Sequence, residues 1–243
     1  MAIYLRAEEG AYAERVLVAG DPGRIAKLGR SLDGAELVTE NRGLVGYTGY
    51  HKGVKVSVQT SGMGCPSMTM VGSELLDYGV RRIIRIGTCS AFGAGVLNGD
   101  LVVETAAAAG DGTTRSIVGP SPYVCVPDFQ LTATLARLAA ERGLRHHLGP
   151  VVTVDVEPHL DARSTLAWRE QGLLAVEMES AVLFLLAMRA QAGGAGKVEA
   201  ASILTVSDGL EGHPDGLQRY MSDEELKVAT DRMHEVALDA LVS

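Results

Sequence analysis

The segment that most constrains the fold reads RIIRIGTCS, from Arg82 to Ser90. Its first five residues form a short, mainly apolar run, which is typical of a strand buried on both faces. Gly87 ends that run and is followed by small side chains through Ser90. Small residues at the carboxyl end of a strand let backbone N–H groups approach a ligand. The segment therefore predicts a buried strand that leads directly into a binding crevice.

The same junction of strand and small residues occurs twice earlier in the chain. The apolar run Arg15–Ala19 leads into GDPGR, from Gly20 to Arg24, and the run Val54–Thr60 leads into Ser61 and then GMG, from Gly62 to Gly64. Helix N-termini that follow such strands favour anions. We therefore expect the three junctions to converge on one anion-binding crevice.

Short strand-like runs alternate with helical patterns along the whole chain. Helices are expected where caps and periodicity agree: Ser67–Tyr78, Asp128–Arg142, Glu179–Ala192 and Ser222–Leu241. Further strands are expected at Leu101–Glu104, Val151–Val154, Leu174–Met178 and Ile203–Val206. This alternation predicts an α/β protein with a mixed, largely parallel central sheet flanked by helices. Because no Pro/Ser-rich linker divides the chain, residues 1–243 are expected to form a single domain.

Composition excludes several classes of protein. Hydrophobic residues make up 47% and charged residues 21% of the chain, which is typical of a globular core and not of disorder. The net charge of −8 argues against a polyanion-binding surface, so no nucleic acid partner is expected. No apolar run approaches the roughly 18 residues of a membrane span. The N-terminus carries no secretion signal.

The three cysteines, Cys65, Cys89 and Cys125, have neither disulfide-framework nor zinc-site spacing. They favour a reducing compartment, and we expect the protein to be cytoplasmic. No group of histidines and carboxylates has metal-ligand spacing either, so no metal site is predicted.

Two arginines accompany the junctions and admit two interpretations each. Arg85 lies inside an apolar strand, where a guanidinium is costly to bury unless it is paired or meets a ligand. Its planar donors suit a phosphate, but a structural ion pair with Glu179 explains it equally well. Arg24 either faces the same anion or is a solvated residue at a helix start.

Carboxylates end two of the buried strands. Glu177 and Glu179 follow one apolar run, where they either accept hydrogen bonds from sugar hydroxyls or pair with a buried arginine. Asp208 ends another, where burial raises the pKa of a carboxyl group and keeps a proton available for a leaving group. The alternative for Asp208 is a cap on the following turn.

A competing interpretation treats the segment from Gly62 to Ser67 (GMGCPS) as a dinucleotide-binding fingerprint. Such a fingerprint has one more glycine and an acidic residue about 20 positions further on. This chain has arginines there, at Arg81, Arg82 and Arg85. A nicotinamide-dependent dehydrogenase is therefore disfavoured.

The ordered set of motifs resembles the family of hexameric bacterial purine nucleoside phosphorylases and uridine phosphorylases. The resemblance covers almost the whole chain and rests on AGDPGR (Ala19–Arg24), RGLVGYTG (Arg42–Gly49), SGMGCPS (Ser61–Ser67), RIGT (Arg85–Thr88), VEMESA (Val176–Ala181) and TVSD (Thr205–Asp208). It implies phosphate-dependent cleavage of the N-glycosidic bond of purine ribo- or deoxyribonucleosides, giving free base and (deoxy)ribose 1-phosphate. The enzyme would be a pentosyltransferase of purine salvage.

The resemblance also implies a role for individual residues. Inorganic phosphate is a co-substrate and no other cofactor is implied; phosphate would be bound by Gly20, Arg24, Arg42, Arg85 and Thr88. Arg42 would reach in from a neighbouring subunit, so a homodimer is the minimal active unit and a homohexamer is expected. The nucleoside would be bound by Tyr4, Met63, Glu157, Val176, Glu177, Met178, Glu179 and Ser207. Asp208 would donate a proton to N7 of the purine, with Arg219 as its helper.

Departures from the family pattern leave two alternatives open. Tyr4 stands where many members have a histidine, and Glu157 stands where an aromatic residue often stacks on the base. Arg163 lies near the place of a uracil-reading arginine, which keeps uridine phosphorylase as an alternative. A nucleoside- or phosphate-binding homologue with weak catalysis is the other.

Overall fold

The structure is a computed structural model that describes residues 2–92, 95–156, 167–209 and 219–243 of the chain. In these residues nine strands form one sheet, in the order β2-β3-β4-β1-β5-β8-β7-β6-β9. The strands span Arg15–Ala19 (β1), Asp33–Thr39 (β2), Gly46–His51 (β3), Val54–Thr60 (β4), Arg82–Ala91 (β5), Leu101–Ala109 (β6), His146–Thr153 (β7), Ala175–Glu177 (β8) and Glu199–Gly209 (β9).

The sheet is organised around β5. This strand pairs in parallel with β1 along Arg82–Arg85 and with β9 from Arg82 to Ala91, and its tip pairs antiparallel with β8. Because β9 also pairs with β6, the strands β5, β8, β7, β6 and β9 close on themselves. On the other side β1 pairs in parallel with β4, and the antiparallel strands β3 and β2 extend the sheet to its edge. The expected mixed, largely parallel sheet is confirmed.

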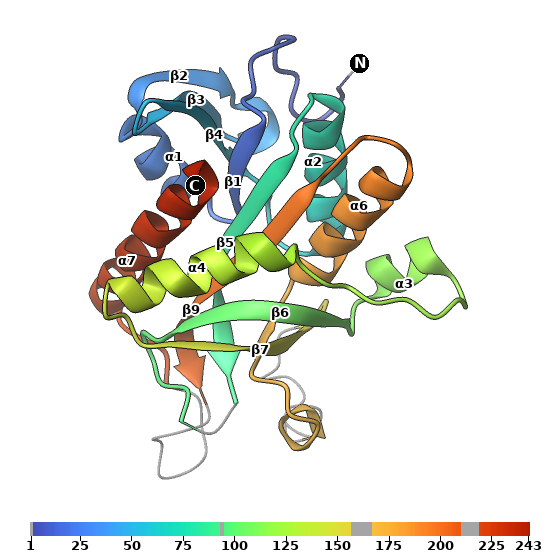
Figure 1. Cartoon of the computed structure of the whole chain (residues 1–243), viewed down its shortest axis with the longest axis vertical. Coiled ribbons are helices and arrows are strands. Elements are labelled where there is room, and N and C mark those ends of the chain that lie inside the picture. The colour runs from blue at the N-terminus through green and yellow to red at the C-terminus, as the bar shows by residue number, and fades with distance from the viewer. Residues whose placement is uncertain (1, 93–94, 157–166, 210–218) are drawn as a thin grey trace.

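Helices cover both faces of the sheet (Figure 1). They span Pro22–Arg30 (α1), Cys65–Asp77 (α2), Gly112–Val118 (α3), Phe129–Glu141 (α4), Ser180–Ala192 (α6) and Asp223–Val242 (α7), with a 3-10 turn (η1) at Asn41–Gly43. Helices α2 and α6 pack together over one apolar core, whereas α1, α4 and α7 lie over a second core. Alternate side chains of β1 pack into the two cores: Val16 and Val18 into the first and Leu17 into the second.

Two helix starts follow the capping chemistry in the sequence. The Asp128 carboxylate accepts a hydrogen bond from the Leu131 N–H group (2.8 Å) at the start of α4. At α7, the Ser222 hydroxyl accepts from the Glu225 N–H (3.3 Å) while the Glu225 carboxylate accepts from the Ser222 N–H (2.9 Å). These reciprocal bonds form the predicted capping box.

Other elements differ from the sequence-based expectation. Helix α2 begins at Cys65 and not at Ser67, because the Ser67 hydroxyl donates to the Ser61 carbonyl (2.6 Å) and caps nothing. Strands β2 and β3 were not expected, since β2 exposes most of its residues at the sheet edge and β3 contains two glycines. Strand β7 begins at His146, five residues before the strand expected at Val151–Val154.

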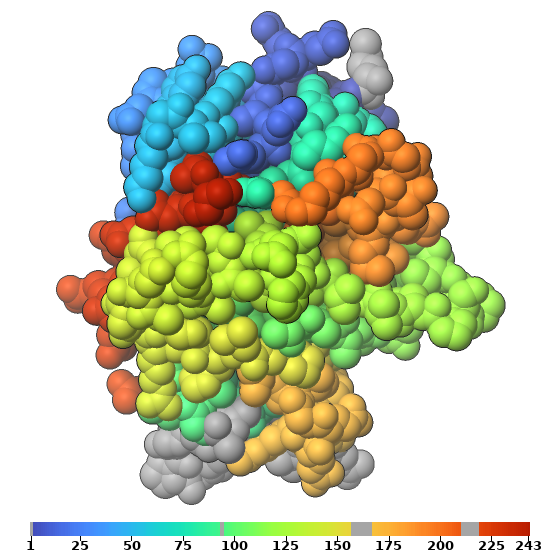
Figure 2. All heavy atoms as spheres, in the orientation of Figure 1, coloured from blue at the N-terminus to red at the C-terminus, as the bar shows by residue number. Residues whose placement is uncertain are grey.

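The C-terminal end of α7 joins three elements through one carboxylate. Asp239 accepts hydrogen bonds from His51 (2.7 Å) at the end of β3 and from Arg142 after α4, and it pairs with Lys52 (2.6 Å). Burial opposes ionisation, but these donors outweigh it and lower the pKa of Asp239 to about 2. Figure 2 shows this end of the chain wedged between the β2–β3 region and α4. None of the helices in the described part of the chain has the length and apolar character needed to cross a membrane.

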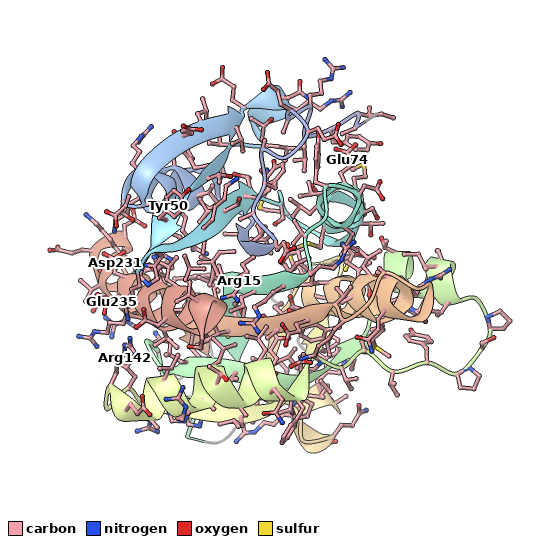
Figure 3. All side chains as sticks on the ribbon, turned by 45° about the horizontal axis from the view of Figure 1, so that its top comes forward. Arg15, Tyr50, Glu74, Arg142, Asp231 and Glu235 are labelled. Carbon is pink, nitrogen blue, oxygen red and sulfur yellow. The ribbon has the colours of Figure 1, made fainter. Side chains whose placement is uncertain are left out.

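The N-terminal segment is held by a carboxylate of α2. Glu74 accepts hydrogen bonds from the backbone N–H groups of Ile3 (2.6 Å), Tyr4 (3.0 Å) and Leu5 (2.8 Å). Figure 3 shows Glu74 on α2 beside this segment. Burial alone raises the pKa of Glu74, but the N–H donors outweigh burial and lower it below its ordinary value. The ionised carboxylate therefore fixes residues 3–5 against α2.

Substitution of this carboxylate by an amide should release the segment. Glu74→Gln turns an NH2 group towards N–H donors, so we expect the free energy of unfolding to fall by about 1–3 kcal/mol. Urea unfolding measures the loss, and limited proteolysis should show new cleavage near residues 3–5. The difference should shrink as the pH falls below the ordinary pKa range of a glutamate and on through the lower pKa of Glu74 in the folded chain, because the carboxylate that causes it becomes protonated.

The matched control is Asp77→Asn, at an exposed position of the same helix. It should change neither measurement. Equal stability and equal protease resistance of Glu74→Gln and the parent protein would contradict the assigned role.

Candidate active site

A cleft of about 540 Å³ opens where β1, β4, β5 and β9 end, and the β8–α6 junction forms part of its wall. All three glycine-rich junctions line it. Of the residues proposed from the sequence, the cleft brings together Gly20, Arg24, Met63, Arg85, Thr88, Val176, Glu177, Met178, Glu179, Ser207 and Asp208. Residues separated by almost 190 positions in the chain therefore share one cavity.

Two glycines of the junctions are required by close contacts. Gly62 has a φ of +71°, and a Cβ at this position would collide with the Ser67 hydroxyl. A Cβ at Gly87 would collide with Nη1 of Arg85. Gly87 therefore makes room for the guanidinium beside the cleft, which explains why the apolar run of β5 ends in glycine.

Arg85 forms the ion pair that one of the two interpretations predicted. Its side chain is 7% exposed, and Nη2 pairs with the carboxylates of Glu179 and Glu177, the latter at 3.2 Å. Its Nη1 is buried and has no hydrogen-bond partner among the described residues. Burial disfavours the charge, but Glu179, Glu177 and Glu104 raise the pKa of Arg85, so the side chain stays cationic. One edge of the guanidinium is thus held by the two carboxylates, while the N–H donors of Nη1 are left without a partner among the described residues.

Arg24 brings a second cation to the cleft. It lies in the first turn of α1, where the positive end of the helix disfavours a cation unless an anion is present. It makes no hydrogen bond or close ion pair with any part of the chain that the structure describes. Burial lowers the pKa of Arg24, with Asp21 opposing that effect. The site therefore offers two guanidinium groups to an anion.

The carboxylates of Glu177 and Glu179 have different surroundings. Glu177 is completely buried, and its oxygens accept hydrogen bonds from the N–H groups of Glu179 (2.7 Å) and Ser180 (2.8 Å) and from the Thr153 hydroxyl. It therefore anchors the start of α6. Glu179 accepts from the Gly64 N–H (2.5 Å) and from Arg85, and it lines the cleft.

Asp208 lies at the end of β9, almost completely buried beside a register shift in the β5–β9 pairing. The Ser90 hydroxyl donates to its Oδ2 (2.7 Å) and the Ser207 hydroxyl donates to its Oδ1 (2.7 Å). The two hydroxyls orient the carboxyl group at the cleft. Sequence reasoning did not select Ser90, although it ends the small-residue run that follows Gly87.

Three other predicted residues, Tyr4, Arg42 and Arg219, do not line the cleft. Arg42 and Tyr4 meet each other outside the cleft, with the guanidinium carbon 5.7 Å from the centre of the tyrosine ring. Arg219 is exposed and lines a separate, shallower depression at the start of α7, so the structure does not place it beside Asp208. Glu157 lies outside the described residues, as does Arg163. Tyr220, which was not predicted, lines the cleft.

A buried histidine lies close to Arg24. His234 in α7 is 5% exposed, and its Nε2 has no hydrogen-bond partner within the described ranges. Burial, together with the charge of Arg24, lowers the pKa of His234 to about 4. The imidazole is therefore neutral at pH 7 and adds no charge beside the anion site.

Comparison with known proteins places this geometry in a family. A family model described as the phosphorylase superfamily matches residues 14–243. The chain is 35% identical to the DeoD-type purine nucleoside phosphorylase of Geobacillus kaustophilus, covering 100% of this chain and 98% of that protein. It is 38% identical to the DeoD-type enzyme of Chromobacterium violaceum over 98% of both chains, and 38% identical to that of Alkaliphilus metalliredigens over 86% and 88%.

The neutral histidine predicts a loss of stability in mild acid. Because the pKa of His234 is about 4 in the folded chain and about 6.5 when unfolded, the unfolded state binds more protons between these values. Stability should therefore fall as the pH drops from about 6.5 to 4, by up to about 3 kcal/mol from this residue. Denaturant unfolding at several pH values measures the slope.

The variant His234→Leu should lack this contribution, while His146→Leu in β7 should retain it. Identical pH profiles for the parent protein and His234→Leu would contradict the assignment.

Proposed function

The chain belongs to the phosphorylase superfamily, and on that premise we propose that it is a purine nucleoside phosphorylase. It transfers the pentosyl group of a purine nucleoside to inorganic phosphate. The observation that carries the proposal is the cleft in which two guanidinium groups with free donors, Arg24 and Arg85, adjoin two carboxylates, Glu179 and Asp208. The two guanidinium groups suit an anion, Glu179 suits the hydroxyls of a sugar, and Asp208 suits the leaving base.

Phosphate binds at the cationic side of the cleft. Nη1 of Arg85 and the side chain of Arg24 donate to its oxygens, supported by the Gly20 backbone and the Thr88 hydroxyl. Two cations, Arg24 in the first turn of α1 and Arg85 on β5, favour a doubly charged anion in the same cleft. They also position it as the nucleophile for C1′ of the sugar.

The nucleoside occupies the rest of the cleft. Glu179 accepts hydrogen bonds from the vicinal hydroxyls of ribose, next to Met178, while Val176, Glu177, Met63 and Ser207 surround the base. As the glycosidic bond breaks, the sugar gains positive charge, and the bound phosphate stabilises that charge. Asp208 donates a proton to N7, so the purine leaves as the neutral base.

In the proposal, two residues that lie outside the cleft of their own chain act in the cleft of a neighbouring subunit. Arg42 and Tyr4 lie together and apart from the cleft of their own chain, which supports their donation to the cleft of a neighbouring copy. The minimal active unit is then a dimer, and a homohexamer is the full assembly.

Two further residues complete the proposed site: Glu157 would contact the base and Arg219 would assist Asp208. The three buried, free cysteines support a cytoplasmic location.

The proposal is tested by the release of free base. Inosine, guanosine, adenosine and uridine are each incubated with the protein, with and without phosphate, and the products are separated by chromatography. We expect purine release that requires phosphate and yields a sugar 1-phosphate. Release without phosphate would indicate a hydrolase, release from uridine alone would reverse the base assignment, and binding without product would indicate a non-catalytic homologue.

The role of the acid predicts a substrate-dependent loss of rate. Asp208→Asn preserves the shape of the side chain but removes the transferable proton, so turnover of inosine should fall by about 10²–10⁴-fold. N7-methylguanosine already carries a positive charge on the base and should be affected much less. Steady-state kinetics with both substrates measure the difference. An equal loss for the two substrates would indicate that Asp208 does not act as the N7 acid.

A further inference from the structure

A third carboxyl group lies buried behind the cleft and has no part in the chemistry described above. Glu104 in β6 is 0% exposed and does not line the cleft. Its Oε1 accepts hydrogen bonds from the hydroxyls of Ser202 in β9 (2.7 Å) and Ser180 in α6 (2.9 Å). Its Oε2 has no hydrogen-bond partner among the residues that the structure describes.

Glu104 lies in the same buried layer as Arg85 and its two partners, Glu177 and Glu179. Ser202 is the register partner of Arg85 in the β5–β9 pairing, and the Ser180 N–H donates to Glu177 (2.8 Å), which in turn pairs with Arg85. Each hydroxyl that contacts Glu104 therefore belongs to a residue that also adjoins the guanidinium or its partner. The charge state of Glu104 is thus coupled to the anion site through direct neighbours.

The hydrogen bonds distinguish Glu104 from the other two carboxylates. Glu177 accepts from two backbone N–H groups and the Thr153 hydroxyl and pairs with Arg85, and Glu179 accepts from Gly64 and Arg85. Such donors favour the ionised form. Glu104 hydrogen-bonds only with hydroxyls, which can accept a hydrogen bond from a protonated carboxyl as well as donate one to it. With one guanidinium and three carboxyls in the layer, the geometry selects Glu104 as the neutral acid.

Burial and the surrounding charges also favour the protonated form of Glu104. Burial first, and then the charge of Glu177, raise the pKa of Glu104 to about 8, against the opposing effect of Arg85. Burial also raises the pKa of Cys89 well above its ordinary value, so that thiol stays neutral. The titratable or charged groups that face this layer are Arg85 and Cys89 on β5, Glu177 on β8, Glu179 at the start of α6, Cys65 on α2 and Asp208 on β9.

We propose that Glu104 is a positioning residue for the anion site: as the neutral acid it leaves the charge of Arg85 to the ligand, and on ionisation it weakens anion binding. The inference rests on the proposed function for the identity of the anion as phosphate. A third negative charge in a buried layer lowers the positive potential that Arg85 presents to the cleft. By reciprocity, a bound anion must favour the protonated form of Glu104 by the same factor.

The experiment uses sulfate, because its charge does not change between pH 6.5 and 9.5 whereas that of phosphate does. Calorimetry gives the affinity of the whole protein for sulfate across this range. For the parent protein we expect a loss of about 5- to 20-fold between pH 7 and 9, a coupling of ordinary size. Glu104→Gln cannot ionise and should lose less than about twofold over the same range. The control Glu141→Gln, at an exposed position of α4, should follow the parent protein.

Parallel curves for the parent protein and Glu104→Gln would overturn the inference, because the loss would then come from other groups. The test is independent of turnover. A protein that releases no base but shows divergent sulfate curves refutes the proposed function alone, whereas an active phosphorylase with parallel curves refutes the role of Glu104 alone.

A second measurement applies even where Glu104→Gln fails to fold. Infrared difference spectroscopy of the parent protein should show a protonated-carboxyl band at pH 7 that disappears as the pH rises, with a midpoint that moves to higher pH when sulfate is bound. Ser202→Ala removes a donor to the ionised form, so it should also raise the midpoint. Absence of the band at pH 7, or a midpoint that neither sulfate nor Ser202→Ala moves, would contradict the proposal.

Discussion

The buried guanidinium of Arg85 is the constraint on which the rest of the site depends. A full charge in an apolar strand is costly unless its surroundings compensate it. Here the compensation comes from elements far apart in the chain: Glu177 on β8 and Glu179 at the start of α6. The same carboxylates accept backbone N–H groups from α6 and from the β4–α2 junction, so the ion pairs also fix the walls of the cleft.

Compensation is incomplete at the other edge of the guanidinium. Nη1 of Arg85 has no partner in the described residues, and Arg24 adds a second cation at a helix N-terminus. Around them the structure keeps other groups uncharged, since burial lowers the pKa of His234 and raises that of Glu104. In our proposal the site is an anion-binding cleft, and its affinity for the anion depends on which neighbouring groups stay neutral.

Much of this arrangement was predictable from local sequence. Mainly apolar runs located β1 and β5, the alternating run VKVSVQT located β4, and the glycines after them located the cleft, because each of these signals lies within a few residues. The edge strand β2 was missed because its exposed, polar residues carry no such signal. For Arg85 the sequence left ion pair and ligand as alternatives; the structure shows the ion pair at one edge of the guanidinium and, among the described residues, no hydrogen-bond partner for Nη1 at the other. Glu104 was taken only as the end of a strand, since its partners Ser180 and Ser202 are 76 and 98 positions away.

The most direct test of this account is a crystal structure of the protein with sulfate and inosine bound. The account predicts a sulfate oxygen within hydrogen-bond distance, about 2.7–3.2 Å, of Nη1 of Arg85, and a second within reach of Arg24. Glu179 should keep its contact with Nη2 and accept hydrogen bonds from the ribose hydroxyls. A sulfate bound elsewhere, with both terminal nitrogens of Arg85 occupied by carboxylates, would contradict it.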